Sequence, residues 1–320
     1  MTMSVSPVHL RTLHEIARLG SFSRAAESLH LSQPAVSLHV RQLEDGLGLP
    51  LLERMGRRAA LTRAGAVLLE HGGRALDALE AAAARVRALR GVVAGRVRVG
   101  TGATASIYLL PPILRRLRAR YPDLELVIVT GNTPEIAKAV AENALDVAVV
   151  TLPVRSRQLV VTPFYTDRLV AIAPPARRRR RPRAFTPGHL AREPLILYER
   201  GGTIRQVIEG WFRRGRVTPR VAMELGNGEA IKELVSAGLG PSITSAISVR
   251  AEARAGTLRV SPLSPPLVRR LGIIRRRDKP LSPPLQALLH ALQRRANRRP
   301  QRERPARLAR GRRLSRVKAG

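Results

Sequence analysis

Apolar residues near the start of the chain recur at helical spacing in two short blocks separated by a turn. Six residues form the two apolar faces: Ala25, Ala26 and Leu29 in the first block, then Val36, Val40 and Leu43 in the second. Ser32 can cap the second helix by accepting a backbone N–H, and Pro34 suits the first turn, where its missing donor costs little. The pattern therefore predicts two crossing helices within residues 1–62, arranged as a helix-turn-helix.

The opposite face of the second predicted helix is polar. Gln33, Ser37 and Arg41 follow one another at spacings of four, so they share the side that points away from the buried residues. Short hydrogen-bonding side chains in such a row suit the base edges in the major groove of DNA. A merely solvated face is the alternative, which the small apolar face, the tight turn and the cap together disfavour. Residues 48–61 then predict a short hairpin, or wing, tipped by arginines that suit the minor groove or phosphate.

A single long helix is predicted over residues 63–93, with Thr62 as its cap. Its apolar residues recur at spacings of three, four or seven: Val67, Leu68, Ala75, Leu79, Ala82, Val86 and Leu89. Gly72 and Gly73 are the weak point of this pattern. An apolar stripe with little else to pack against predicts a partner helix, and therefore a dimer.

From residue 96 the pattern changes to short apolar strands that alternate with helices. Strands are predicted at 97–99, 124–129, 146–150, 169–173, 195–198, 220–225, 242–245 and 271–274, and helices at 113–120, 134–142, 204–213, 229–237 and 284–294. This alternation predicts a parallel sheet covered by helices. We expect two α/β lobes joined by two crossing strands, with a ligand cleft between the lobes.

The predicted fold class is therefore mixed. A mainly α winged helix-turn-helix occupies 1–62, a linker helix 63–93, a two-lobed α/β domain 94–293 and a basic tail 294–320. Within the α/β domain, lobe I is predicted to comprise 96–167 and 269–293, and lobe II 168–268.

Composition limits the class of protein. No run approaches the ~18 apolar residues that a membrane span requires, and the N-terminus does not resemble a secretory signal. Cysteine is absent, which excludes disulfides and thiolate zinc sites. We therefore expect a soluble cytoplasmic protein with no membrane partner. Aromatic residues make up only 3% of the chain, which favours aliphatic cores.

The net charge of +34 suggests a polyanionic partner but does not locate its binding site. The basic excess is concentrated in Arg177–Arg181 and in the tail, whose composition predicts disorder. We interpret the arginine run as a solvated loop. The tail can add sequence-independent attraction to phosphate.

Catalysis is poorly supported. The seven histidines form no metal-binding motif, with His30 and His39 interpreted as surface groups, and no nucleophile or phosphate-loop motif is present. We expect no enzymatic activity, no cofactor and no metal. The stretch from Gly100 to Ala105 matches the dinucleotide fingerprint G-x-G-x-x-A, but the next strand ends at Gly131 without the acidic residue that the fingerprint requires. Two interpretations of this stretch remain. It is either a tight strand-to-helix turn or a helix N-terminus that holds an anionic or polar effector.

The chain closely resembles the N-terminal domain of LysR-type transcriptional regulators in SFSRAAESLHLSQPAVSLHVRQLEDGLGLPLLER and the following GRRAALTRAG. The resemblance continues through VRVGTGATASIYLLPPIL, GNTPEIAKAV, ELGNGEAIKELVSAGLG and RRRDKPLSP, and covers about residues 8–293. It implies a winged helix, a linker helix for dimerisation and an effector domain similar to a small periplasmic binding protein. The implied partners are double-stranded promoter DNA, a small-molecule effector, further copies of the chain in a homodimer or homotetramer, and RNA polymerase as an additional candidate. The implied location is the bacterial cytoplasm, in association with the nucleoid.

Site residues follow from the motifs and the resemblance. Those expected to contact DNA are Arg24, Ser32, Gln33, Pro34, Ser37, Arg41, Arg54, Arg57 and Arg58. Those expected at the effector cleft are Thr101, Gly102, Ala103, Thr104, Asn132, Thr133, Thr151, Thr203, Arg205 and Asn227. Arg205 can pair with a carboxylate through two N–H groups, and a solvated surface arginine is the more frequent alternative. Two positions depart from the family: Leu52 replaces an aromatic residue, and Gly102 replaces a common serine, which suggests a different effector.

Three other functions compete with a sequence-specific regulator that responds to a small anionic or polar metabolite. A solute-binding protein of a transport system shares the two lobes but has no use for residues 8–62. A sequence-independent nucleic-acid-binding protein would depend on the basic tail. An oxidoreductase would depend on the G-x-G-x-x-A turn.

Overall fold

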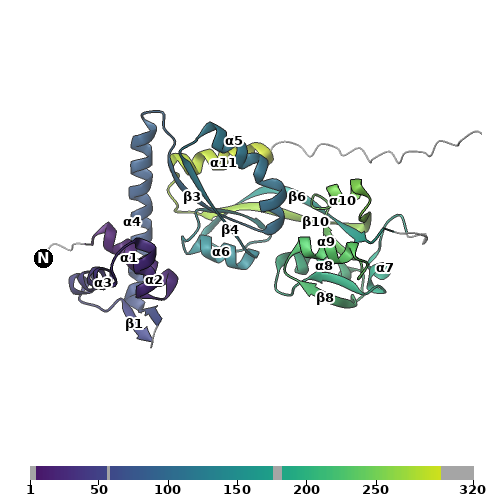
Figure 1. The fold of residues 1–320 in the computed structure, drawn as a ribbon, viewed down its shortest axis with the longest axis horizontal. Helices are drawn as coiled ribbons and strands as arrows, with labels where there is room; N and C mark the ends of the chain where they lie inside the picture. The colour runs from purple at the N-terminus through teal and green to yellow at the C-terminus, as the bar shows by residue number, and fades with distance from the viewer. Residues whose placement is uncertain (1–4, 56–57, 176–181, 297–320) are drawn as a thin grey trace, which may run out of the picture.

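The computed structural model describes residues 5–55, 58–175 and 182–296. The predicted DNA contact Arg57, the run Arg177–Arg181 and the tail from residue 297 onward lie outside these ranges. Along the chain follow an N-terminal helical domain, one long helix and a two-lobed α/β domain (Figure 1). No helix in the described ranges is both long enough and apolar enough to cross a membrane.

The N-terminal domain contains three helices and a hairpin. In order they are α1 (Pro7–Leu19), α2 (Phe22–Leu29), α3 (Gln33–Leu47), β1 (Leu52–Met55) and β2 (Arg58–Leu61). Side-chain oxygens of Ser6, Ser21 and Ser32 cap the three helices by accepting backbone N–H groups of the first turn. Ala25 and Val36 are fully buried in one cluster shared with α1. The predicted winged helix-turn-helix is confirmed.

The long helix α4 (Arg63–Ala88) begins at Thr62, whose hydroxyl accepts the N–H of Gly65 at 3.0 Å. It runs without a break through Gly72, which lies against the Leu10 side chain of α1, and it ends at Ala88 rather than at 93. Four apolar side chains of the predicted stripe stay more than half exposed: Val67, Leu79, Val86 and Leu89. The rest of the described chain therefore leaves this face of α4 uncovered.

Lobe I is a sheet with helices on both faces. Its parallel strands are β4 (Leu124–Thr130), β3 (Gly95–Thr101) and β5 (Val147–Thr151), with β3 in the centre. Helices α5 (Pro111–Arg120) and α11 (Pro283–Ala296) pack on one face of the sheet, and α6 (Thr133–Ala141) packs on the other. The carboxyl ends of the three strands meet at one edge, where predicted effector residues follow.

Two long antiparallel strands, β6 (Leu159–Ala173) and β10 (Arg259–Arg276), connect the lobes (Figure 1). They belong to one six-stranded sheet of order β4-β3-β5-β10-β6-β9, which ends in lobe II at β9 (Ser242–Ser245). The sequence predicted only 169–173 and 271–274 of these strands. The predicted lobe boundaries at 167/168 and 268/269 fall within them.

Lobe II adds a parallel pair of strands and four helices. These elements are α7 (Pro187–Ala191), β7 (Leu195–Tyr198), α8 (Thr203–Arg214), β8 (Val221–Leu225), α9 (Gly228–Ser236) and α10 (Arg250–Ala255). Its core contains Trp211, whose ring contacts Phe212 edge to face at 5.2 Å, together with Phe185 and Tyr198. The expectation of purely aliphatic cores is therefore wrong for this lobe, which gathers several of the chain's few aromatic side chains.

A nearly buried lysine is one of the contacts between lobe I and α4, and Arg74 of α4 also lies 3.9 Å from Asp278 Oδ2. Lys279, in the turn before α11, places its Nζ 2.7 Å from Asp77 Oδ1 on α4 and 2.7 Å from Asp146 Oδ1 before β5. It also donates to Asn143 Oδ1 at 2.9 Å, which gives all three of its protons a partner. Asp146 accepts the backbone N–H of Arg98 at 2.7 Å. This cluster ties the linker helix to the sheet of lobe I.

Candidate DNA interface and effector cleft

The outer face of α3 presents the predicted row of polar side chains. Gln33 and Arg41 are exposed and Ser37 is half-buried. The Gln33 Nε2 donates to Ser37 Oγ at 2.9 Å, so the two side chains are aligned with each other before any contact with DNA. Ser32 caps the helix through the N–H of Ala35 at 3.3 Å. The exposed Pro34 sits in the first turn, as expected for a residue without a backbone donor.

Three of the remaining predicted DNA contacts belong to described elements, one in α2 and two in the hairpin. Arg24 is exposed in the first turn of α2. Arg54 belongs to β1, and Arg58 starts β2, in a hairpin whose register pairs Met55 with Arg58. Leu52, the departure from the family pattern, packs against apolar residues of two neighbouring clusters and keeps a core role.

Hydrogen bonds between elements hold α3 in place. Glu44 Oε1 accepts the N–H of Leu51 at 2.7 Å, which fixes the chain leading to the wing against the end of α3. Thr12 Oγ1 of α1 lies 2.9 Å from Nδ1 of His39 on α3. The His39 ring also stacks on His9 with centroids 4.6 Å apart, so the interpretation of His39 as a surface group is wrong. Burial, together with His39, lowers the pKa of His9.

Five predicted effector residues meet at the carboxyl edge of the lobe I strands. The N–H of Gly131 donates to the Thr101 carbonyl at 3.1 Å, and the N–H of Thr151 donates to Thr133 Oγ1 at 3.3 Å. Thr101 is fully buried and its hydroxyl donates to the Gly102 carbonyl, so that hydroxyl is used within the turn. Asn132 caps α6, where its side chain accepts the N–H of Glu135 at 3.1 Å.

The turn from Gly102 to Thr104 is more accessible. Ala103 is exposed, while Gly102 and Thr104 are half-buried. A π-helical turn, η1 (Ala105–Leu109), follows, and the first turn of α5 then begins at Pro111. π-turns are rare and occur often at functional sites. A helical turn starts directly after Gly102, where the N–H of Ser106 donates to the Gly102 carbonyl at 3.1 Å, and it continues as the π-turn η1.

Two of the predicted lobe II residues occupy helix N-termini. Thr203 is the first residue of α8, and Asn227 caps α9 by accepting the N–H of Glu229 at 2.8 Å. Such helix ends carry free backbone donors and a partial positive charge that favour polar or anionic groups.

The prediction that Arg205 offers a free guanidinium to the effector is wrong. Arg205 is only 2% exposed, and its Nε donates to Glu209 Oε1 at 2.8 Å. Its Nη2 donates to Glu224 Oε1 at 3.1 Å, and its Nη1 donates to the Tyr198 carbonyl. These bonds satisfy the charge within lobe II, so Arg205 braces α8 against β7 and β8.

One polar cluster joins the two lobes, and sequence reasoning missed it. The Tyr108 hydroxyl of η1 donates to Glu229 of α9, with oxygen distances of 2.9 and 3.0 Å, and accepts from Lys232 Nζ at 3.0 Å. Burial disfavours the charged form of Lys232, yet hydrogen bonds to Glu229 and Glu252 raise the pKa of Lys232 overall. The partners of Tyr108 are more than 120 residues away in sequence, so no local pattern could have signalled the contact.

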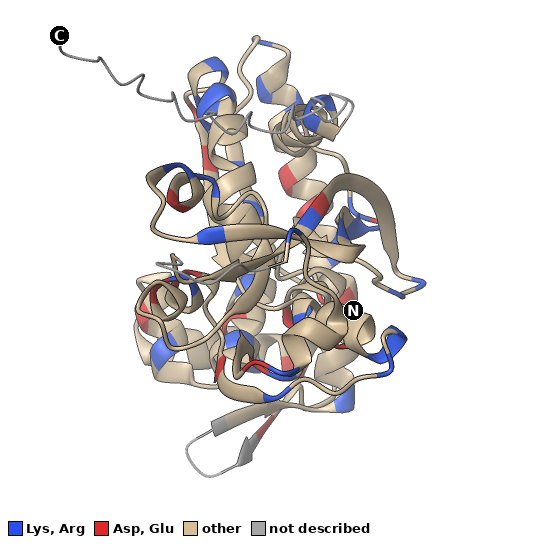
Figure 2. Cartoon of the chain, turned by 90° about the vertical axis from the view of Figure 1, so that its right-hand side faces the viewer, with Lys and Arg blue, Asp and Glu red and all other residues tan. Residues whose placement is uncertain are grey.

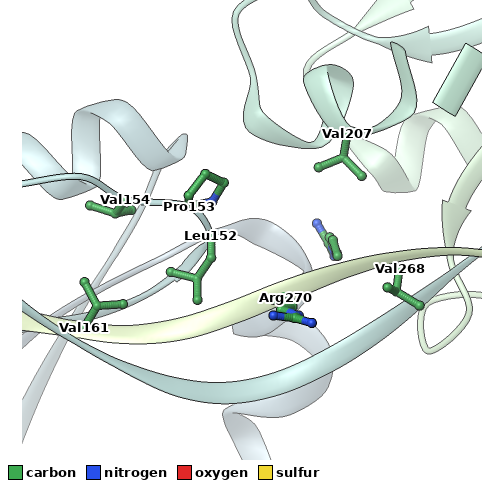
Figure 3. A pocket seen from close by; sticks show the side chains of 8 residues that line it. Leu152, Pro153, Val154, Val161, Val207, Val268 and Arg270 are labelled. Atoms are coloured by element: carbon green, nitrogen blue, oxygen red, sulfur yellow. The ribbon is translucent and has the colours of Figure 1, made fainter. Parts of the chain in front are cut away.

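A groove of about 490 Å³ opens between the lobes beside the two long strands (Figure 3). Residues from lobe I, from α8 and from β10 line it: Leu152, Pro153, Val154, Val161, Val207, Val268, Arg269 and Arg270. It begins directly after Thr151 at the end of β5 and reaches α8 one turn beyond Thr203. None of the predicted effector residues lines the groove itself. No cluster of histidine, aspartate and glutamate able to hold a metal ion occurs in the described ranges.

Comparison with known proteins gives consistent matches over nearly the whole chain. Residues 7–66 match the family description "Bacterial regulatory helix-turn-helix protein, lysR family", and residues 90–297 match "LysR substrate binding domain". The RuBisCO operon transcriptional regulator of Allochromatium vinosum is 34% identical over 250 residues, covering 78% of this chain and 82% of that protein. The HTH-type transcriptional regulator CbbR of Xanthobacter flavus is 36% identical over 275 residues, covering 84% and 82%. A solved full-length OxyR variant from Pseudomonas aeruginosa has a TM-score of 0.71 at 24% identity, covering 91% of this chain and 95% of that one.

Proposed function

Because the chain belongs to the LysR family of transcription regulators, which pair a DNA-binding helix-turn-helix with an effector-binding domain, we propose specific residue roles for it. Gln33 and Ser37 on α3 read base edges in the major groove, with Pro34 against the same bases and Arg41 at the end of the row. Arg24 and Ser32 contact phosphate. Arg54, Arg57 and Arg58 of the wing contact the flanking groove. The observation that carries this proposal is the exposed Gln33–Ser37 pair on the outer face of α3.

The effector site is proposed between the lobes. The backbone donors and hydroxyl of the turn from Thr101 to Thr104 face it from lobe I, with the Asn132–Thr133 turn and Thr151 at the same edge. Thr203 and Asn227 contribute the N-termini of α8 and α9. Effector binding would change the relative position of the lobes only if the effector prefers one arrangement over the other.

The exposed apolar face of α4 supports a dimer in which linker helices pack together, and pairs of dimers would form the homotetramer. Action on promoter DNA in the bacterial cytoplasm, at the nucleoid and with RNA polymerase, belongs to the same proposal. So does a regulatory role without enzymatic activity. The relative named above as a RuBisCO operon transcriptional regulator supports a RuBisCO operon as the target. Failure to bind any promoter of such an operon in the genome of origin would overturn that target.

Ser37→Ala tests the base-reading role. We expect the substitution to weaken the binding free energy for a selected operator duplex by about 1–3 kcal/mol. The binding free energy for a scrambled duplex should stay nearly unchanged. Fluorescence anisotropy titrations at one fixed salt concentration measure both affinities. Ser23→Ala, an exposed serine of α2, is the matched control and should change neither. Equal losses on both duplexes would show that Ser37 does not read sequence.

A further inference from the structure

Strand alternation separates two neighbouring arginines of β10 onto opposite faces of the sheet. Arg269 lies opposite Asp167 of β6 and binds its Oδ2 through Nε at 2.6 Å on a buried face. Arg270 has the same parity as Val268 and Gly272, so these three residues share the other face. Leu152 lies directly over Gly272 on that face, since a Cβ at Gly272 would stand 2.8 Å from the Leu152 side chain. Arg270 therefore belongs to the wall of the interlobe groove.

The charge of Arg270 is uncompensated. Arg269 has a carboxylate partner that is 1% exposed, whereas the exposed guanidinium of Arg270 makes no hydrogen bond or ion pair with any residue that the structure describes. Because Glu209 is already bound to Arg205, the nearest helix of lobe II offers Arg270 no free carboxylate from that position. Both arginines line the groove. Arg269 is ion-paired with Asp167, although its buried Nη2 has no hydrogen-bond partner, so Arg270 is the guanidinium of the groove without a carboxylate partner.

Apart from Arg269 and Arg270, the groove wall is apolar and open to solvent. Val161 is 37% exposed and Val268 is 45% exposed, although both are large apolar side chains of central strands. Leu152, Pro153 and Val207 complete the wall, with Val207 reaching in from lobe II (Figure 3). A concave site of this size with mostly apolar walls and one charged group left without a carboxylate partner has the properties of a small-ligand pocket.

We propose that the interlobe groove binds an organic anion with an apolar body, in which Arg270 holds a carboxylate through two N–H groups and the valine and leucine side chains cover the hydrocarbon. This inference rests on the proposed effector cleft. The groove adjoins that cleft at Leu152, next to Thr151, although none of the residues proposed for the effector lines it, and the inference names the chemical class of the ligand. A strongly hydrated sugar phosphate fits the groove less well, because one arginine cannot balance two charges and the apolar wall would face hydroxyl groups. Val207 and Leu152 come from different lobes, so the ligand bridges them and favours their approach.

Isothermal titration of the full-length protein with hexanoate, octanoate and phenylacetate tests the proposal, with the matching amides as neutral controls and inorganic phosphate as the competing anion. We expect at least one carboxylate to bind and its amide to bind about tenfold more weakly or worse, in line with a lost charge-assisted hydrogen bond. Arg270→Gln should reduce carboxylate affinity by a similar factor. Arg213→Gln, an exposed arginine at the end of α8, should leave it unchanged.

Three results would overturn the proposal: no carboxylate binds, the amide binds as well as the acid, or Arg270→Gln has no effect. Phosphate binding that depends on Arg270 in the absence of carboxylate binding would also overturn it. The substitution Thr104→Val distinguishes the groove proposal from the proposed effector cleft. If binding depends on Thr104 and not on Arg270, the effector cleft stands and the groove assignment falls. Retained operator binding by every variant shows that the DNA-binding role is independent of either result.

Discussion

Several single side chains in this protein connect elements in ways that their positions in the sequence do not indicate. Glu15 of α1 accepts from Arg18 Nε at 2.9 Å and from the Ser28 hydroxyl of α2 at 2.5 Å. The hydrogen bond from Arg18 is the largest cause that lowers the pKa of Glu15 to about 2; burial opposes it and Ser28 adds to it. Glu15 therefore links α1 to α2 at the point where the first helix of the motif crosses.

This lowered pKa predicts a pH-dependent stability. The ionised Glu15 stabilises the folded state above its ordinary pKa of 4.5, and the contribution disappears as the pH falls towards 2. Glu15→Gln should lower the free energy of unfolding by about 1 kcal/mol at neutral pH, a value discounted because Arg18 is half exposed. Urea unfolding followed by circular dichroism measures it. Glu27→Gln, an exposed carboxylate of α2, is the control, and an undiminished effect of Glu15→Gln near pH 2 would contradict the linkage.

At this scale, sequence reasoning succeeded where chemistry is local. Ser32 and Thr62 cap the helices that they were expected to cap, because a cap depends only on residues three positions away. Arg205 shows the limit. Its partner Glu209 is visible at i+4, but the second carboxylate, Glu224, reaches it from β8, and only the folded lobe brings that strand beside α8. His39 was misjudged for the same reason, since Thr12 and His9 come from another helix.

At the scale of elements, close packing rather than propensity decides which glycines matter. A Cβ at Gly65, in the first turn of α4, would lie 2.0 Å from the Leu51 carbonyl oxygen, which is backbone and cannot move alone. A Cβ at Gly73 in the same helix would meet only the Asn143 side chain, at an ordinary 3.5 Å. The two glycines of one helix thus have opposite roles, and the sequence pattern indicated a weak point only at Gly72 and Gly73.

Alanine substitutions at Gly65 and Gly73 test whether the two glycines have different roles. Gly65→Ala should destabilise the N-terminal domain by about 1–3 kcal/mol, because the loop at Leu51 has to shift away from α4. Gly73→Ala should be neutral or stabilise the helix by up to about 1 kcal/mol, because alanine has the higher helix propensity. Thermal unfolding measures both, with operator affinity as a second readout for the position of the wing. Equal effects of the two substitutions would show that the Gly65–Leu51 contact is unimportant.

The elements that sequence patterns missed have a common physical reason. β10 contains Pro262, Pro265 and Pro266, and its pairing with β6 shifts register after Pro262, so its first half does not look like a strand. The burial pattern of β6 changes along its length, because its first half belongs to one lobe and its second half to the other. The short parallel strands of lobe I were found because each contains a short apolar run, although only β5 is buried along its whole length. Trp211 and Phe212 likewise show that a low aromatic content of the whole chain does not prevent a local cluster of aromatic side chains in one core.

At the scale of the whole molecule, β5 connects the cleft to the linker helix. Its carboxyl end, Thr151, lies at the edge where the groove begins, and Asp146, just before its first residue, binds Lys279. A strand of this length spans about 16 Å at ~3.3 Å per residue and is held in the centre of a sheet, so it moves as a rigid unit. The Tyr108 cluster sets the distance between the lobes at the other side of the cleft. A change in the relative position of the lobes can therefore be transmitted to α4 through the rigid strand β5.

Lys279 is the point at which this connection can be cut. Its side chain is 8% exposed, and its ammonium group lies between Asp77 of α4 and Asp146 of lobe I, so Lys279→Met would leave two carboxylates near each other without this cation. We expect α4 and lobe I to separate, with a coupling free energy of about 1–3 kcal/mol between Lys279→Met and Asp77→Asn in a double-mutant cycle. Hydrogen exchange of the α4 amides and of residues 143–146 measures the contact directly. Lys138→Met removes an exposed lysine of α6 that is paired with Glu142, and it should leave hydrogen exchange at both places unchanged.

Operator binding should survive Lys279→Met, because α3 and its capping and core contacts lie in the N-terminal domain. Any effector that shifts operator affinity in the wild type should lose that influence in the Lys279→Met variant. Additive effects of the two substitutions would show that Lys279 and Asp77 do not join the lobes to the linker helix.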